Sequence, residues 1–165
     1  MVGREQDGVW ITLKEVIHAA PEEVGSCVAT ASGLCRWLAV LAEYPPEVGA
    51  RLELSWDRDW SRTTELKILA YEFDQGGHAS DASGKTRVKW EWFPSPLDET
   101  PVPVEITVTP IPEGGARVIV RHGPFAEDHD TLLTVADSAE SWRWYLCNLR
   151  SILESKHDMR TVRPL

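Results

Sequence analysis

The sequence predicts an α+β domain in which a curved antiparallel sheet of about six strands wraps one long C-terminal helix, with two short helices after the first strand. Three observations support this prediction. Alternating apolar and polar residues fill the middle of the chain, a helical period fills its last quarter, and Pro21 begins a short helical segment after the first strand. No linker or repeat divides the chain, so we expect one domain, 1–165, with a core of about 9–157.

The N-terminal part combines one strand with two short helices. Residues 9–18 are rich in β-branched and aromatic types and predict the first strand. A helix is predicted from Pro21, because proline and the two acids after it suit a first turn, although Gly25 weakens that helix by about 1 kcal/mol relative to alanine. A second short helix is predicted from Ser32, with apolar residues at helical spacing: Leu34, Trp37, Leu38 and Leu41.

Five further segments predict the strands of an antiparallel sheet. They are residues 50–56, 63–73, 87–93, 102–109 and 117–122. Within 87–93, the residues Val88, Trp90 and Trp92 share one apolar face. Residues 74–86 contain no large apolar side chain and predict a loop.

The last two strands are joined by a predicted turn over 112–115. If their apolar faces match, Val108 opposes Val120 and Ile106 opposes His122. A slip of one residue would bring arginine side chains inside, so the pattern specifies the register strongly.

The last quarter of the chain predicts an amphipathic helix of about 20–25 residues that ends near residues 157–158. It is the only predicted element long enough to cover the apolar face of the sheet. The basic tail after it is expected to be loose. The apolar positions recur every three or four residues: Val135, Ala139, Trp142, Leu146, Leu149 and Leu153.

Composition narrows the possible partners and the compartment. The formal net charge is −9, which opposes nucleic-acid binding and docking on anionic membranes. The N-terminus lacks a signal-peptide pattern, and no apolar run is long enough to span a bilayer. Three cysteines at unrelated spacings fit free thiols, so we expect a soluble, cytoplasmic protein. No spacing matches a metal site, a phosphate loop or a cofactor motif, so no metal and no cofactor are expected.

Four segments carry a resemblance to a known family: residues 20–24 (APEEV), 90–92 (WEW), 120–125 (VRHGPF), and Trp142 with 146–154 (LCNLRSILE). In their order and spacing, the chain resembles the START-like or SRPBCC superfamily, in the branch similar to the activator of the heat-shock-protein-90 ATPase. The resemblance implies the helix-grip fold. It does not settle function, because the superfamily includes lipid and hormone carriers, polyketide cyclases and co-chaperone domains. Members of this branch often carry a tryptophan where this chain has Gly25, which is expected to thin the packing of the first helix and enlarge any cavity.

Our first functional hypothesis is that a small hydrophobic or amphipathic molecule binds in a cavity between the sheet and the terminal helix. Eight tryptophans favour an aromatic lining, although a solid aromatic core would use the same residues. His122 would be a polar anchor on the inward face, or else a structural histidine. The expected lining is Trp37, Leu41, Leu66, Ile68, Trp90, Trp92, Ile106, Val120, His122, Trp142, Leu146 and Leu149.

Two alternatives remain open. An enzyme of the polyketide cyclase or dehydratase kind would use His122 with an acid or a tyrosine, Tyr71 or Tyr145, to move protons, but no paired catalytic constellation is visible. A protein-interaction domain, including a co-chaperone-like one that binds a chaperone, would use the acidic surface or the 74–86 loop. The sequence decides neither the ligand nor whether the chain is an enzyme.

Overall fold

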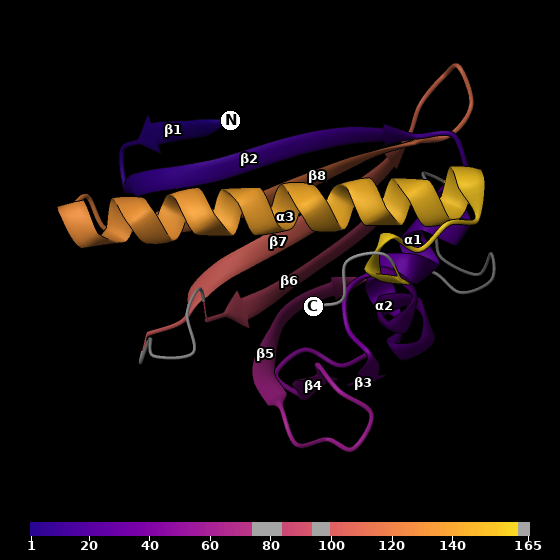
Figure 1. Cartoon of the computed structure of the whole chain (residues 1–165). Coiled ribbons are helices and arrows are strands. Elements are labelled where there is room, and N and C mark those ends of the chain that lie inside the picture. The colour runs from indigo at the N-terminus through magenta and orange to yellow at the C-terminus, as the bar shows by residue number, and fades with distance from the viewer. Residues whose placement is uncertain (74–83, 94–99, 162–165) are drawn as a thin grey trace.

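The computed structural model describes residues 1–73, 84–93 and 100–161. Its elements in chain order are β1 (Val2–Glu5), β2 (Gly8–Ile17), α1 (Pro21–Ala29), α2 (Ala31–Trp37), β3 (Leu41–Glu43), β4 (Arg51–Ser55), β5 (Thr63–Glu72), β6 (Thr86–Trp92), β7 (Val102–Pro110), β8 (Ala116–Phe125), α3 (His129–Ser155) and a 3-10 turn, η1 (Met159–Thr161). Figure 1 shows α3 lying along the sheet, with α1 and α2 near its C-terminal end. The predicted α+β class with two short helices and one long helix is confirmed.

The strands form one antiparallel sheet in the order β1-β2-β8-β7-β6-β5-β4-β3. Within the described residues the sheet therefore has eight strands, where about six were predicted. The two additional strands lie at its edges. Strand β1 is fully exposed and lacks the apolar alternation that marks the other strands, and β3 is only three residues long. Strand β1 and η1 also lie outside the range 9–157.

Leu41 was predicted in the second helix and instead lies on β3. Helix α2 ends at Trp37, and the next backbone groups turn to the sheet. The N–H of Val40 donates to the carbonyl of Ser55 at 2.9 Å, and Leu41 pairs with Ser55 in the ladder. The apolar spacing that reached Leu41 was that of a helix, but pairing with β4 satisfies the backbone there.

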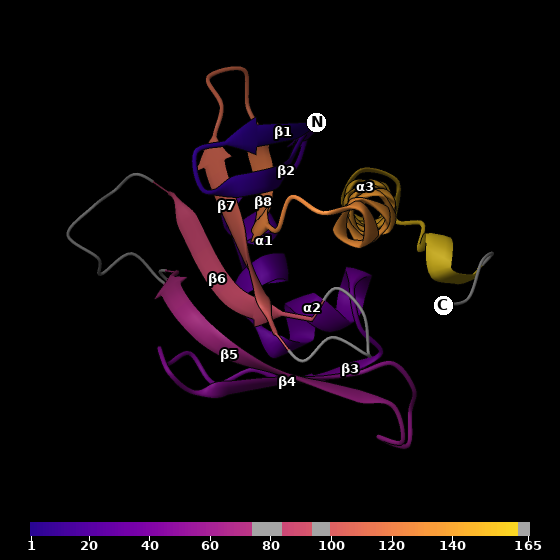
Figure 2. The same ribbon diagram turned by 90° about the vertical axis from the view of Figure 1, so that its left-hand side faces the viewer.

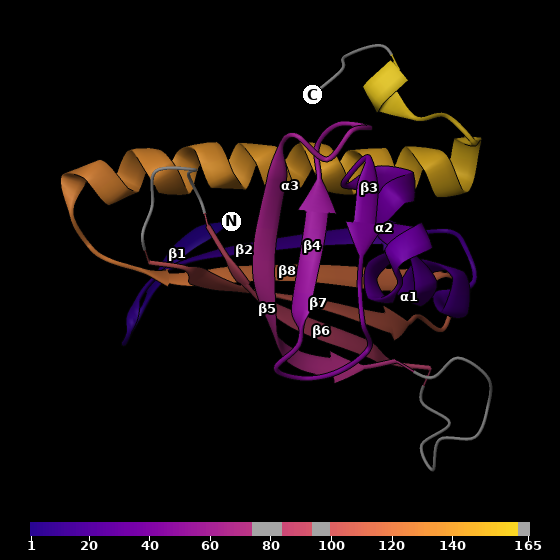
Figure 3. The same cartoon turned by 90° about the horizontal axis from the view of Figure 1, so that it is seen from below.

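The sheet is strongly curved. Viewed along α3, it bends from β1 and β2 at one end to β4 and β3 at the other, and α1, α2 and α3 lie on its concave side (Figure 2). Seen from below, β2 and β8 run along α3 whereas β5 and β4 cross it (Figure 3). Irregularities in the β2–β8 and β5–β6 pairings add to the normal twist of the strands. The chain therefore places α3 in the hollow of the sheet, as predicted.

The register of the β7–β8 hairpin is shifted by two residues from the predicted one. Ile106 opposes Val120, and His122 opposes Val104. A shift of two keeps every side chain on its predicted face, so the apolar pattern cannot distinguish the two registers. The turn between the strands determines which register forms. The N–H of Ile111 donates to the carbonyl of Gly115 at 3.2 Å, and this hydrogen bond centres the hairpin one residue earlier than expected.

Helix α3 is 27 residues long, slightly longer than predicted, and ends at Ser155. The Asp128 side chain accepts a hydrogen bond from the N–H of Thr131 and caps its first turn, and Lys156 closes it in the left-handed conformation. The apolar stripe is buried as predicted, except that Ala139 is half-buried. Two ion pairs connect α3 to β2, because both Arg143 and Arg150 contact the carboxylate of Glu15.

Gly25 does not leave the space predicted for it. A Cβ at this position would collide with the Oγ1 atom of Thr86 on β6 and would lie 3.3 Å from the Phe73 ring. The small residue therefore lets α1 approach β6 closely, and the prediction of thinner packing and a larger cavity at this helix is wrong.

The tail after α3 is not loose over its described part. The guanidinium of Arg160 donates to the carbonyl oxygens of Ala39 and Arg36 at 2.7 Å and of Cys35 at 2.9 Å. It also pairs with Asp158 at 2.8 Å. The tail therefore fastens the C-terminal end of α2. Among the described residues, no helix is long and apolar enough to cross a membrane.

Candidate functional site

A row of five rings links β8 to the β4–β5 hairpin across α3. We call it the aromatic row: Phe125, His122, Trp142, Trp92 and Trp56. Successive ring centroids lie 4.7, 6.3, 4.9 and 6.5 Å apart. The rings come from β8, α3, β6 and the residue after β4. Three of the five, His122, Trp142 and Trp92, were predicted lining residues, and the structure brings them together.

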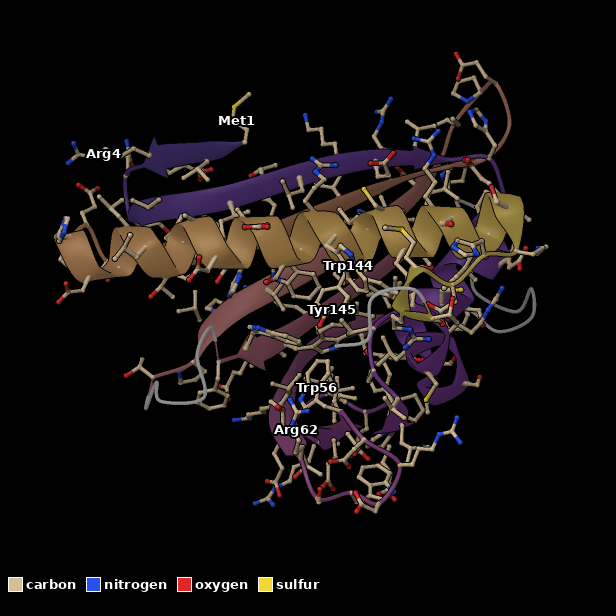
Figure 4. All side chains as sticks on the ribbon, viewed as in Figure 1. Met1, Arg4, Trp56, Arg62, Trp144 and Tyr145 are labelled. Carbon is tan, nitrogen blue, oxygen red and sulfur yellow. The ribbon has the colours of Figure 1, made fainter. Side chains whose placement is uncertain are left out.

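The aromatic row leads from the interior to the surface. Phe125, His122 and Trp142 are buried, with exposures of 3%, 0% and 2%, whereas Trp92 and Trp56 are half-buried. Tyr145 extends the row along α3, with its ring 6.1 Å from that of Trp142. Figure 4 shows Tyr145 and Trp144 on the side of α3 that faces Trp56. The outer end of the row therefore lies between α3 and the β4–β5 hairpin.

His122 carries one satisfied and one unsatisfied nitrogen. The Nε1–H of Trp142 donates to its Nδ1 at 3.2 Å. Indole nitrogen is only a donor, so Nδ1 must be the unprotonated nitrogen and Nε2 carries the hydrogen of the neutral ring. Nε2 is buried and has no hydrogen-bond partner among the described residues. A buried donor without an acceptor costs about 1–3 kcal/mol, which makes this atom the conspicuous polar feature of the row.

Burial also keeps His122 uncharged. It lowers the pKa of His122 to about 4, against a smaller upward effect of the Val102 backbone carbonyl, which approaches the ring without completing a hydrogen bond to Nε2. No charged side chain contributes to that shift. The inner end of the aromatic row is therefore apolar and neutral, and His122 supplies a single N–H donor within it.

Trp90 shares a strand face with Trp92 but belongs to a separate group. Its Nε1–H donates to the hydroxyl oxygen of Tyr44 at 2.9 Å, and the two rings lie 5.9 Å apart. The Tyr44 ring lies 5.6 Å from that of Tyr71, whose hydroxyl donates to the carbonyl of Ala29 at 2.8 Å. Burial raises the pKa of both tyrosines. The indole of Trp90 is therefore satisfied by a core hydroxyl.

The other predicted lining residues lie in the core or at its edge. Trp37 is fully buried, its Nε1–H donates to the carbonyl of Cys27 at 2.9 Å, and its ring lies 6.4 Å from that of Tyr145. Leu41 is half-buried on β3. A contact of these residues with a ligand stays a prediction, as it does for the remaining buried members: Leu66, Ile68, Ile106, Val120, Leu146 and Leu149.

Two members of the aromatic row, Phe125 and Trp56, were missed from the sequence. Phe125 is three residues from His122, an odd spacing that would put the two on opposite faces of a regular strand. The β2–β8 ladder pairs Val9 with Phe125 and Ile11 with His122, so β8 contains one extra residue and both rings face the same way. Trp56 had a visible signal in the sequence, because it continues the alternation of Leu52 and Leu54 one residue beyond the end of β4.

The sheet around α3, together with the two helices after β2, forms the helix-grip fold that was predicted. Solved structures that share this fold include the following three. Protein SSP2350 from Staphylococcus saprophyticus has a TM-score of 0.69 at 16% identity, covering 92% of this chain and 96% of its own. The Aha1 dimer from Colwellia psychrerythraea has a TM-score of 0.66 at 19% identity, and the match covers 88% of this chain and 96% of that one. DynU16, a protein of the dynemicin biosynthetic locus, has a TM-score of 0.64 at 17% identity, and the match covers 90% of this chain and 48% of that one.

The comparisons at the level of sequence are negative. No family model matches the chain, and no curated protein matches it. The structural likeness confirms the fold that the resemblance implied. At these identities it carries no information about a ligand or a reaction.

Proposed function

We propose that the protein binds a small hydrophobic or amphipathic molecule between α3 and the sheet, along the aromatic row. The observation that carries this proposal is the run of rings from half-exposed Trp56 and Trp92 to buried Trp142 and His122. Rings in edge-to-face and tilted arrangements offer flat apolar surfaces to a ligand, and an N–H at the inner end gives one point of orientation.

The composition of the row supports an apolar ligand with few polar atoms. Its members bury apolar surface and carry no charge, and the pKa of His122 stays low through burial. Ligand sites in proteins combine such linings with a small number of placed polar groups. The Nε2–H of His122 would fill that role, because no described residue accepts its hydrogen bond.

The alternative of a cyclase-like or dehydratase-like enzyme has less support. A general base at Nε2 needs a free lone pair, but the hydrogen bond from Trp142 to Nδ1 leaves the hydrogen on Nε2. The Tyr71 hydroxyl is engaged by Ala29 in a separate group. Tyr145 lies next to Trp142, with its pKa raised by burial, which suits a neutral hydrogen-bonding group better than a base.

A chaperone-binding role would use the acidic surface or the 74–86 loop, and residues 74–83 of that loop lie outside the described residues. No contact within the described part of the chain favours that role over ligand binding.

The test is a titration of the protein with fatty acids, sterols and aromatic polyketides, followed through tryptophan emission and calorimetry. We expect saturable binding of at least one compound.

Replacing Trp56 with alanine should weaken this binding by about tenfold or more, since stacking on an indole is lost. Trp60→Ala is the matched control, because Trp60 lies in the same hairpin, is 36% exposed, and has no ring partner among the described residues. No response across the panel, or equal losses in both variants, would contradict the proposal.

A further inference from the structure

We infer that the ligand presents an uncharged carbonyl oxygen on a flat aromatic frame, that this oxygen accepts the hydrogen bond of His122 Nε2, and that the site rejects carboxylates. This inference rests on the proposed ligand site and goes further, because it names the chemical class of the ligand. It follows from three features of the inner end of the aromatic row.

The first feature is the direction of the hydrogen bond. Because Trp142 Nε1 can only donate, His122 Nδ1 can only accept, and the neutral ring then offers a donor at Nε2. A partner for this nitrogen must therefore be an acceptor. The side chain is fully buried and its Nε2 is unpaired among the described residues, so the position is specific for one acceptor atom and is not a solvated surface group.

The second feature is the absence of positive charge near this donor within the described part of the chain. No lysine or arginine contributes to the pKa of His122, which burial lowers to about 4. Arg121, its neighbour on β8, faces the other side of the sheet, where it pairs with Glu5 at 2.8 Å and stacks on the Trp10 ring. A carboxylate at the inner end would lose its hydration without gaining a cation or a second donor, whereas a ketone oxygen needs only one.

The third feature is the aromatic character of the neighbouring side chains. The Phe125 ring lies 4.7 Å from His122 at an interplanar angle of 63°, and the Trp142 ring lies 6.3 Å away at 85°. Both rings are steeply inclined to the imidazole, so the surroundings of His122 are aromatic and uncharged. A planar aromatic frame matches such surroundings chemically, and an oxygen in its plane can accept from the Nε2–H.

A matched series of probes tests the inference: 2-acetonaphthone, 2-ethylnaphthalene and 2-naphthoate at pH 7. They share one ring system and differ in the group that would meet His122. We expect the ketone to bind about tenfold more tightly than the hydrocarbon, and the carboxylate at least about a hundredfold more weakly than the ketone.

The outcomes separate this inference from the proposed function. Equal binding of ketone and hydrocarbon, or tighter binding of the carboxylate, would leave a ligand site in place and overturn the carbonyl assignment. Binding of none of the three would overturn both. The His122→Phe variant keeps a ring and removes the donor, so it should abolish the preference for the ketone over the hydrocarbon.

A measurement on the unmodified protein keeps the inference testable if the variant does not fold. Nitrogen-15 spectra of labelled histidine should show His122 as the tautomer protonated at Nε2, and the Nε2–H resonance should move when 2-acetonaphthone is added. A ring protonated at Nδ1, or a resonance that does not respond to a bound ketone, would contradict it.

Discussion

Gly25 on α1 lies against Thr86 on β6 so closely that no side-chain carbon fits between them. The glycine costs helix stability by itself, since alanine is better by about 1 kcal/mol inside a helix. The absence of a side chain, however, lets α1 pack closely against the sheet beside Thr86, which is itself only 3% exposed.

We expect the Gly25→Ala variant to be destabilised by about 1–2 kcal/mol, because overpacking costs about 1–3 kcal/mol and outweighs the gain in helix propensity. Urea denaturation measures this change in the free energy of unfolding. In a Thr86→Ala background the same change should be neutral or stabilising, since the hydroxyl that it meets is gone. The same loss in both backgrounds would show that Thr86 does not limit the approach of α1.

Arg160 gives a second prediction, because one guanidinium satisfies three carbonyl oxygens around the C-terminal end of α2. Its side chain is only 16% exposed. Removing it should leave these acceptors poorly paired, so we expect Arg160→Ala to lower the free energy of unfolding by about 3 kcal/mol and to speed hydrogen exchange in α2.

The matched control is Arg143→Ala, which removes an exposed arginine from its ion pair with Glu15 at 3.1 Å and leaves Arg150 paired with the same carboxylate. Ion pairs of an exposed side chain contribute less than about 1 kcal/mol, so this variant should be nearly as stable as the parent protein. If both variants lost the same amount, the described tail would not fasten α2 and its contacts would be incidental.

The overall arrangement follows from two sequence patterns. Alternation predicted the central strands, and the period from Val135 to Leu153 predicted the helix in the hollow of the sheet. Strand β1 was not predicted because it has no apolar face. Leu41 was predicted in a helix because it fits a helical spacing, although its backbone pairs with β4. The register of β7 and β8 was off by two because such a shift preserves every face.

The candidate site was predicted in part, and its geometry was not. Alternation placed His122 and Trp92 on the inward face, and the helical period did the same for Trp142. Nothing in a single sequence shows that an indole of α3 donates to an imidazole of β8, because this pairing depends on how the helix lies over the sheet. Phe125 was missed because the extra residue in β8 breaks the alternation that would have placed it on the face of His122. Trp90 and Trp92 share the same pattern in the sequence, and only the hydrogen bond from Trp90 to Tyr44 in the folded protein separates their roles.

The buried state of His122 gives a prediction about pH. A histidine in an unfolded chain has a pKa of about 6.5, whereas burial holds that of His122 at about 4 in the folded protein. Between these values unfolding takes up a proton, so stability is lost as the pH falls from 6.5 towards 4. This one group should account for a loss of about 3 kcal/mol across that window.

Urea denaturation at several pH values between 7 and 4 measures the effect. The His122→Phe variant should lose less stability than the parent protein over the same window, since it has no imidazole to protonate. His157→Gln is the control for the loss of an imidazole as such, because His157 is exposed after α3. Parallel curves for the parent and His122→Phe would mean that His122 is not held neutral by burial.

The most direct test of ligand binding along the aromatic row uses the indole N–H signals of the eight tryptophans in a proton–nitrogen correlation spectrum. Titration with 2-acetonaphthone should shift the signals of Trp142, Trp92 and Trp56, because their rings form the row. The signals of Trp10, stacked under Arg121, and of Trp60 should stay in place. Shifts confined to Trp10 or Trp60, or none at all at saturating probe, would contradict a binding site between α3 and the sheet.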